Sequence, residues 1–305
     1  MISFRQHVVT IVAIFLALAL GMLAGSAFIQ PRLVDQLRAQ VEDQRGMMDA
    51  LRAQVGELRD RLGAERAFND AALGHLTQGR LLGQRIVVVA QEGLDDRALS
   101  EARRALEEAG ATPVVLVARG ALAPEDAVAQ AALAEMLGRP GVDPAELPAL
   151  AARALAERLA SDVRRQPRED DLLGALLVEG YLTPADAGLS EEVLAGLGGS
   201  RQVVLVLAGG GDADPAMPPA AFAVPLVERL AELGLPVAAG QPTGTAVPFV
   251  ELLRREGLGG LVTVDDIDES RGGAALVLGL QRLILTGEGG DYGTQDGSAP
   301  LPPPP

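Results

Sequence analysis

An uncharged apolar segment near the amino terminus passes directly into a heptad repeat, and this junction constrains the chain more than any other feature. No charged side chain occurs in the 24 positions from residue 8 to residue 31. As a helix, the 22 residues 8–29 would span about 33 Å, enough to cross a hydrocarbon core of about 30 Å. We therefore predict that residues 1–31 form a short cytoplasmic stub and a transmembrane helix. A cleavable signal peptide is the alternative, because small residues stand at positions 25–27.

The charges flanking this segment predict its orientation. Arg5, His7 and the amino terminus precede it, whereas Arg32, Asp35 and Arg38 follow it. Only the flank after the segment mixes basic residues with an acid, Asp35. Because the more purely basic flank tends to stay in the cytoplasm, we expect a single-pass protein of the cell membrane with a cytoplasmic amino terminus. The bulk of the chain would then be extracytoplasmic. One helix of this kind does not form a pore by itself.

Residues 32–70 carry a heptad pattern typical of a coiled-coil stalk. Eight of the ten a and d positions between residues 34 and 66 are apolar. Branched residues at a with Leu at d favour a parallel pair of helices, so we predict a homodimer. A lone helix folded back on the distal domain is the alternative. The a positions are Val34, Val41, Met48, Val55 and Leu62, and the d positions are Leu37, Gln44, Leu51, Leu58 and Glu65.

Every e position of this register is arginine. One interpretation is pairing within the helix, since acids stand three residues before the first three of these arginines, at positions 35, 42 and 49. The other is that Arg59, Arg61 and Arg66 bind an acidic partner protein of the envelope. The arginine column consists of Arg38, Arg45, Arg52, Arg59 and Arg66.

The distal part alternates short apolar strands with helices, which predicts an α/β fold with a Rossmann-like parallel sheet over residues 85–286. Residues 121–198 are rich in Ala, Leu and Glu and are predicted to be a helical insertion. Residues 287–305 are rich in Gly and Pro and are predicted to be a disordered tail. The predicted strands are 86–90, 114–117, 203–207, 236–239 and 261–264, and the predicted helices are 95–109, 124–137, 144–163, 169–181, 220–233 and 246–255.

Charge and composition exclude several functions. Residues after position 80 carry 17 Arg against 33 acids, a balance that repels phosphate backbones and argues against nucleic-acid binding. The chain has no Cys, which excludes disulfides and thiolate metal sites. Its two histidines, at positions 7 and 75, precede the distal domain, so a histidine base is not available there. We therefore expect no enzymatic activity, although a pair of carboxylates could still catalyse hydrolysis.

Ligands of parallel sheets usually bind beyond the carboxyl ends of the strands, so the turns there are the candidate sites. Four turns are polar: 92–96, 209–214, 241–245 and 265–269. The turn at Gly209 lacks the spacing of a nucleotide-binding loop. Clustered carboxylates could hold Mg²⁺ or Ca²⁺. The alternative is that the acids of the 265–269 turn cap the helix that begins near Gly272 and are otherwise solvated. The metal-site candidates are Asp212, Asp265, Asp266 and Asp268.

Five separated motifs resemble one family. They are Met1-Ile-Ser-Phe-Arg-Gln-His-Val-Val9, Phe15-Leu-Ala-Leu-Ala-Leu-Gly21, Leu23-Ala-Gly-Ser26, Val264-Asp-Asp-Ile-Asp268 and Gly287-Glu-Gly-Gly-Asp-Tyr-Gly293. Together they are similar to the mycobacterial copper transport protein B (MctB) family of actinobacterial envelope proteins.

This resemblance implies a role in copper homeostasis or efflux. Copper enters only through the resemblance, because the soft Cys and Met ligands that copper(I) prefers are absent or scattered here. Coiled-coil members of the family are also implicated in controlling a cell-wall hydrolase and cell separation. The alternative function is therefore that of a non-enzymatic interaction protein acting on such a partner.

Overall fold

The computed structural model describes residues 4–161, 171–186, 189–190, 193–194 and 196–303, except for the side chains of residues 26–37 and 66. The chain divides into two compact units, Met1–Ala67 and Phe68–Pro305.

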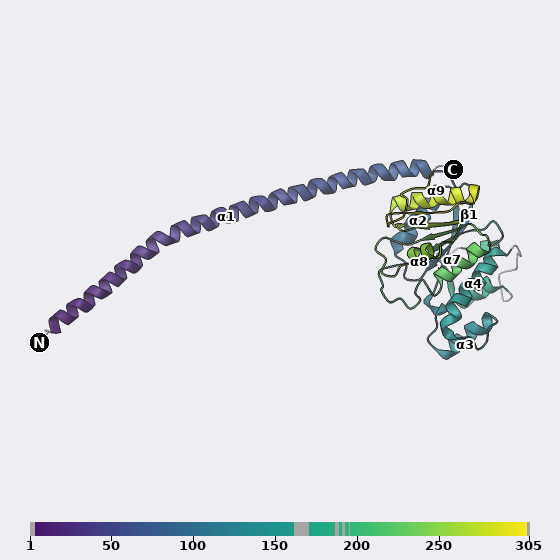
Figure 1. The fold of residues 1–305 in the computed structure, drawn as a ribbon, viewed down its shortest axis with the longest axis horizontal. Coiled ribbons are helices and arrows are strands. Elements are labelled where there is room, and N and C mark those ends of the chain that lie inside the picture. Colours follow the sequence, from purple (N-terminus) through teal and green to yellow (C-terminus); the bar gives the residue numbers. More distant parts are fainter. Residues whose placement is uncertain (1–3, 162–170, 187–188, 191–192, 195, 304–305) are drawn as a thin grey trace. The chain divides into compact units, whose positions relative to one another are not determined.

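The first unit is part of one continuous helix, α1 (Phe4–Thr77, 74 residues) (Figure 1). The helix continues through Pro31, so the predicted boundary between membrane segment and stalk is not a break in secondary structure. Its residues Phe4–Gly25 are long and apolar enough to cross a membrane, with a mean hydropathy of 2.6. None of the side chains in this span is buried, as expected for a surface that lipid covers.

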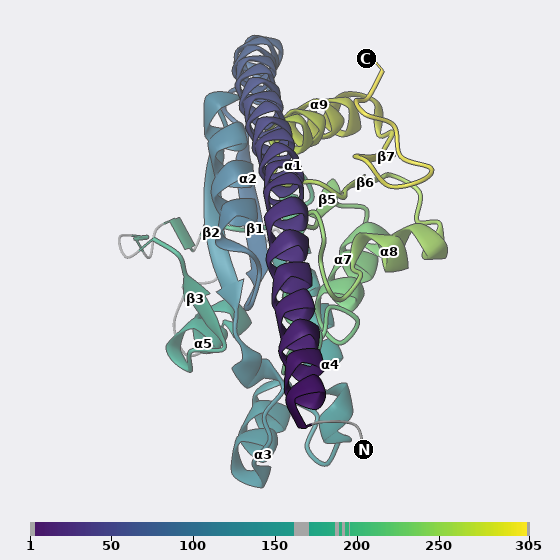
Figure 2. The ribbon, with the colours of Figure 1, turned by 90° about the vertical axis from the view of Figure 1, so that its left-hand side faces the viewer.

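The second unit is built on a seven-stranded sheet with the order β3-β2-β1-β4-β5-β6-β7, which Figure 2 shows running across the domain. All neighbouring strands are parallel except β2 and β3. The α/β fold with a largely parallel sheet is therefore confirmed. The strands are β1 (Arg85–Gln91), β2 (Thr112–Ala118), β3 (Leu182–Pro184), β4 (Val203–Leu207), β5 (Val237–Gly240), β6 (Leu261–Val264) and β7 (Gly290–Tyr292).

Helices cover both faces of the sheet, as its apolar strands require (Figure 1). Alternate residues of β1 serve opposite sides: Val87 and Val89 belong to one core, whereas Ile86 and Val88 belong to the other. The first core contains α3 (Ala127–Met136), α4 (Leu147–Ala160), α5 (Leu172–Val178), α7 (Ala223–Glu232) and α8 (Val250–Glu256). The second contains α2 (Asp96–Glu108) and α9 (Ser270–Thr286).

The segment predicted as a helical insertion supplies much of the first core. Short 3₁₀ helices η1 (Gly120–Leu122) and η2 (Pro144–Glu146) accompany α3 and α4 there. The buried Arg158 of α4 pairs with the buried Asp171 that precedes α5, with 2.5 Å between Nε and Oδ1. Residues 162–170, which include the predicted end of one helix and start of the next, lie outside the described residues. The segment is therefore integral to one face of the domain.

Both edge strands differ from the predictions. The sequence pattern did not predict β3, and residues 287–305 were expected to be disordered, yet Gly290–Tyr292 form β7 beside β6. A further bridge joins Tyr292 to Ala299. Polar anchoring explains the order of this segment, because the Asp265 carboxylate accepts hydrogen bonds from Thr294 N (2.7 Å) and Ser298 Oγ (2.8 Å).

Candidate functional site

A pocket opens at the carboxyl ends of β1 and β4, where the chain leaves the sheet in opposite directions. After β1 it enters α2, in the second core, whereas after β4 it reaches α7, in the first core. A divergence of this kind leaves a crevice, and ligands of open α/β sheets bind in such crevices. The pocket has a volume of about 180 Å³.

Glycines allow the turns that surround the pocket to approach one another. A Cβ atom on Gly210 would lie only 2.2 Å from the carbonyl oxygen of Gly93, and one on Gly209 would lie 2.6 Å from Thr245 Oγ1. Gly209 also has a φ of +109°, which L side chains rarely adopt. The glycine-rich turn that the sequence singled out therefore serves close packing of three turns.

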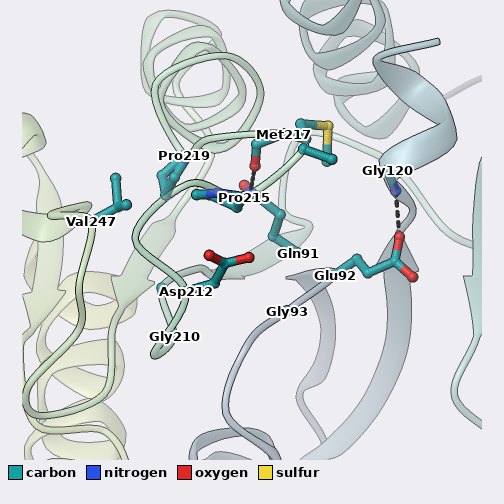
Figure 3. Close-up of a pocket in the computed structure, with 12 residues that line it drawn as sticks. Gln91, Glu92, Gly93, Gly120, Gly210, Asp212, Pro215, Met217, Pro219 and Val247 are labelled. Carbon is teal, nitrogen blue, oxygen red and sulfur yellow. Dashed lines mark hydrogen bonds between the residues drawn. The ribbon is translucent and has the colours of Figure 1, made fainter. Parts of the chain in front are cut away.

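The walls of the pocket are mainly apolar, with a few polar groups at one end. Pro215, Met217, Pro219 and Val247 form the apolar part. Figure 3 shows the carboxylate of Asp212 projecting from the Gly210 turn toward the part of the pocket that Pro215 borders, whereas Glu92 points away toward Gly120. The Oε2 atom of Glu92 accepts a hydrogen bond from Gly120 N, and its Oε1 atom lies 2.7 Å from Nη2 of Arg119.

Gln91, the last residue of β1, is the buried polar group of this pocket. Its side chain is 5% exposed, and its Nε2 atom donates a short hydrogen bond to the carbonyl of Met217. Its Oε1 atom is buried and has no hydrogen-bond partner. An unpaired buried acceptor of this kind costs about 1–3 kcal/mol. Gln91 therefore holds an acceptor in the wall of the pocket that a ligand could satisfy.

The other predicted turns lie farther along the same edge of the sheet. Gln241 follows β5, and its Oε1 atom accepts hydrogen bonds from Phe249 N and Val250 N, which begin α8. Thr243 donates to both carboxylate oxygens of Asp268, from its N atom (2.6 Å) and its Oγ1 atom (2.7 Å). The contacts between Thr243 and Asp268 link the turn after β5 to the turn after β6.

Asp265 is fully buried and is held by cationic and neutral donors. Its Oδ2 atom lies 2.8 Å from Nη1 of Arg254, which is itself 14% exposed. Burial raises the pKa of Asp265, but the hydrogen bonds from Thr294, Arg254 and Ser298 outweigh burial and hold the pKa below its usual range. The carboxylate therefore stays ionised and ties residues 292–298 to β6.

Asp266, the next residue, is in a different electrostatic environment. It is also buried, and its Oδ2 atom faces Nε of the half-exposed Arg271 at 2.7 Å. Burial raises the pKa of Asp266 to about 6, and the charge of Arg271 only partly offsets this shift. Two adjacent aspartates thus have pKa values displaced in opposite directions.

The structure does not gather the four metal-site candidates around one point. Asp212 lines the pocket, whereas Asp265, Asp266 and Asp268 are engaged by Arg254, Arg271 and Thr243. Within the described ranges there is no group of three or more His, Asp or Glu residues arranged to hold a metal ion. The alternative, that these acids are solvated and cap the helix near Gly272, is wrong as well. Glu269 at the start of α9 makes no side-chain capping hydrogen bond. Asp265 and Asp266 are buried and therefore not solvated.

Several important residues were missed by the sequence analysis. No sequence motif marked Gln91 or Met217, and Arg254 was predicted only as part of the helix at residues 246–255. Each of them contacts a residue distant in sequence, as Arg254 does when it donates a hydrogen bond to the carbonyl of Tyr292. A buried polar residue at the end of an apolar strand was the available signal for Gln91.

Four members of the arginine column, Arg38, Arg45, Arg52 and Arg59, are exposed on α1. Among the three intrahelical pairs expected, Asp49 and Arg52 form one, at 3.3 Å. In the described part of the chain, Arg59 and Arg61 have no acid within ion-pair distance, and the side chain of Arg66 lies outside the described residues. Apolar a and d side chains are exposed beside them, including Val41 (43%) and Leu58 (56%).

These features define a protein with an amino-terminal apolar helix able to anchor it, a long helical segment and an α/β domain. Comparison with known proteins identifies the family. Residues 1–303 match the family described as "Copper transport outer membrane protein, MctB", and the chain belongs to this family. The resemblance inferred from the sequence motifs is confirmed, and the family connects the chain with copper transport in the cell envelope.

Relatives similar to this chain extend over almost its full length. Proteins named "Copper transporter MctB" from Mycobacterium tuberculosis (strain ATCC 25618 / H37Rv) and Mycobacterium bovis are 27% identical over 317 residues, which cover 98% of each chain. The protein of that name from Mycobacterium leprae is 28% identical over 319 residues, which cover 99% of each chain.

Proposed function

We propose that this chain serves copper homeostasis or efflux as a non-enzymatic envelope protein, anchored by residues 8–29 and paired as a parallel homodimer through residues 34–66. The observation that carries this proposal is the uncovered apolar surface of α1. Residues 8–25 carry no charge and are apolar around the helix, whereas from residue 34 to residue 66 all the large apolar side chains except Met47 stand at heptad core positions. The first pattern suits lipid, and the second suits another helix.

Pairing of two α1 helices would bury exposed apolar side chains and so lower the free energy of the pair. The exposed apolar core residues from position 41 to position 62 are Val41, Met48, Leu51, Val55, Leu58 and Leu62. Burying one such side chain is worth about 1.5–3 kcal/mol, so six on each helix can outweigh the entropy lost on pairing. Anchoring of both copies in one membrane supports the parallel orientation, and the charges that flank the apolar segment support the cytoplasmic amino terminus. The strand order, with helices on both faces, supports the Rossmann-like assignment of the distal domain.

The donor groups of the chain support an indirect role toward copper. The chain has no Cys, and three of its four carboxylate candidates, Asp265, Asp266 and Asp268, are engaged by Arg254, Arg271 and Thr243. Exposed Met47 and Met48 stand in the heptad segment, whereas Met217 is buried beside the pocket. We therefore propose that copper is the cargo of a system to which this protein contributes without binding the metal itself.

A copper-tolerance assay tests the proposal. Cells that lack the gene should grow poorly in copper, and the intact chain should restore growth. The double variant L51D/L58D, which places charges in the helix seam, should fail to restore growth, whereas A53D, on the outer f position, should succeed. Equal copper tolerance with and without the gene would refute the copper role, and full rescue by L51D/L58D would refute the need for pairing.

A second candidate function is control of a cell-wall hydrolase and of cell separation through the stalk. The observation that favours it is that Arg59 and Arg61 point their charges into solvent without an acid partner among the described residues. Cells lacking the gene would then stay joined after division, and their copper tolerance would be unchanged. The two phenotypes distinguish the two functions.

A further inference from the structure

The pocket between β1 and β4 has features of a binding site that are independent of copper. Three turns distant in sequence close around it, and glycines at positions 209 and 210 make the close approach possible. The β4 turn is fixed to the β5 turn by hydrogen bonds from Ala246 N to Gly210 O (2.8 Å) and from Gly210 N to Thr245 Oγ1 (3.0 Å). The site is therefore formed in advance of any ligand.

Its size and walls restrict the ligand to a small molecule with an apolar body. A cavity of about 150 Å³ lined by apolar side chains accommodates benzene, and this pocket measures about 180 Å³. Pro215, Met217, Pro219 and Val247 give the body of the ligand apolar contacts. The pocket is too small for a dinucleotide.

The polar groups restrict the charge of the ligand. Asp212 lines the pocket, and its Oδ1 atom accepts a hydrogen bond only from the backbone of Asp214 (3.0 Å), with no cation paired to it among the described residues. Glu92 is already neutralised by Arg119. Among the residues that the structure describes, no Arg lines the pocket. A phosphate or carboxylate would meet the charge of Asp212 without compensation, so the site disfavours anions.

Gln91 adds a requirement for a hydrogen-bond donor. Because its amide nitrogen donates to Met217, its orientation is fixed and its oxygen remains the acceptor. That oxygen is buried and unpaired. A ligand that donates to it would remove the cost of leaving it unsatisfied.

We propose that this pocket binds a small organic cation, in which an ammonium or amidinium group meets Asp212 and Gln91 while a body of about the size of benzene packs against Pro215, Met217 and Val247. The positive charge pairs with the Asp212 carboxylate, and an N–H group donates to Gln91 Oε1. The apolar body replaces water along the proline-rich wall.

Three probes of nearly equal shape test the charge requirement. Benzylammonium, benzyl alcohol and benzoate are titrated into the full chain in detergent micelles, and binding is measured by saturation-transfer NMR. We expect benzylammonium to bind about tenfold more tightly than benzyl alcohol, a difference of about 1.4 kcal/mol. Benzoate should bind more weakly than either. Equal binding of benzoate and benzylammonium would overturn the proposal.

A matched pair of variants locates the binding. Asp212→Asn removes the carboxylate that lines the pocket, whereas Asp214→Asn removes the same charge two residues away and keeps the backbone donor to Asp212. Asp212→Asn should abolish the preference for benzylammonium over benzyl alcohol, and Asp214→Asn should retain it. Partition of the probes into micelles is common to both variants and cancels. Loss of the preference in both variants, or in neither, would contradict the assignment to this pocket.

Discussion

At the scale of single residues, the domain uses buried charge in two ways. Asp265 is ionised and surrounded by donors, whereas Asp266 is buried with one half-exposed cation. Their pKa values differ because α8 and the segment after β7 bring donors to Asp265 alone. Stability should therefore respond to these two groups in separate ranges of pH.

The pKa of Asp266 predicts that the domain becomes less stable as the pH rises from about 4 to about 6. The folded-state pKa is raised from 3.8 to about 6, so the folded state binds the proton more tightly. Its contribution is full below pH 4 and is lost as the pH rises through 6, a change of about 3 kcal/mol. Urea unfolding followed by near-UV circular dichroism of Tyr181 and Tyr292 should show this fall, and Asp266→Asn should remove it. A wild-type stability that is flat from pH 4 to 6 would contradict the prediction.

Asp265 acts in the opposite direction. Because its folded-state pKa is lowered, its contribution is present above the unfolded-state pKa and is lost as the pH falls through the folded-state value. The acid limb of the same unfolding series therefore reports Asp265, separately from the fall assigned to Asp266.

Arg254 is predicted to be a major determinant of stability. It contacts Asp265, Thr263 and the carbonyl of Tyr292. Arg254→Leu would leave the charge of Asp265 buried and unpaired, which typically costs about 3–5 kcal/mol. The control is Arg255→Leu, because Arg255 is 66% exposed and should change the unfolding free energy by less than about 0.5 kcal/mol. Similar effects of the two variants in urea unfolding would refute this role of Arg254.

At the scale of elements, apolar strands were predictable and edge strands were not. The predictions for β4 and β6 coincide with the observed bounds, because Val203–Leu207 and Leu261–Val264 are fully buried and, apart from Thr263, apolar. The edge strands β3 and β7 have three residues each, and they include Pro, Asp and Gly, which are typical of turns. Their pairing depends on β2 and β6, so no local pattern marks them.

The candidate site was predictable to a similar degree. The turns 92–96, 209–214, 241–245 and 265–269 were identified because parallel strands bring their carboxyl ends to one edge. The sequence could not show that Asp212 would lie in a pocket while Asp265 would pair with Arg254. That distinction depends on which turns meet, and therefore on the strand order.

The arginine column makes a prediction about α1. If Arg59, Arg61 and Arg66 bind an acidic envelope protein, the triple Gln variant should lose crosslinks to that protein while keeping crosslinks between its own copies. The control replaces Arg38, Arg45 and Arg52 in the same way, because Arg52 already pairs with Asp49. Photocrosslinking from position 53 in the intact envelope gives both readouts. Unchanged partner crosslinks in the triple variant would refute docking at these residues.

At the scale of the whole molecule, the apolar helix predicts the location of everything after it. The chain has no Cys, so single cysteines report topology without background. A membrane-impermeant maleimide should label Ala53→Cys in intact spheroplasts, whereas it should label Ile2→Cys only after permeabilisation. The reverse pattern would contradict the cytoplasmic amino terminus, and a mature chain that begins after the small residues at positions 25–27 would indicate a cleaved signal peptide.

The position of β7 determines the order in which the protein is completed. Synthesis proceeds from the amino terminus, so the apolar helix of α1 is available to the membrane long before Gly290–Tyr292 are made. Until those residues arrive, β6 has an open edge, and Asp265 lacks the donors Thr294 and Ser298. If the apolar helix anchors the chain as proposed, the nascent chain reaches the membrane while its α/β domain is still unfinished, and the domain closes only when β7 has emerged.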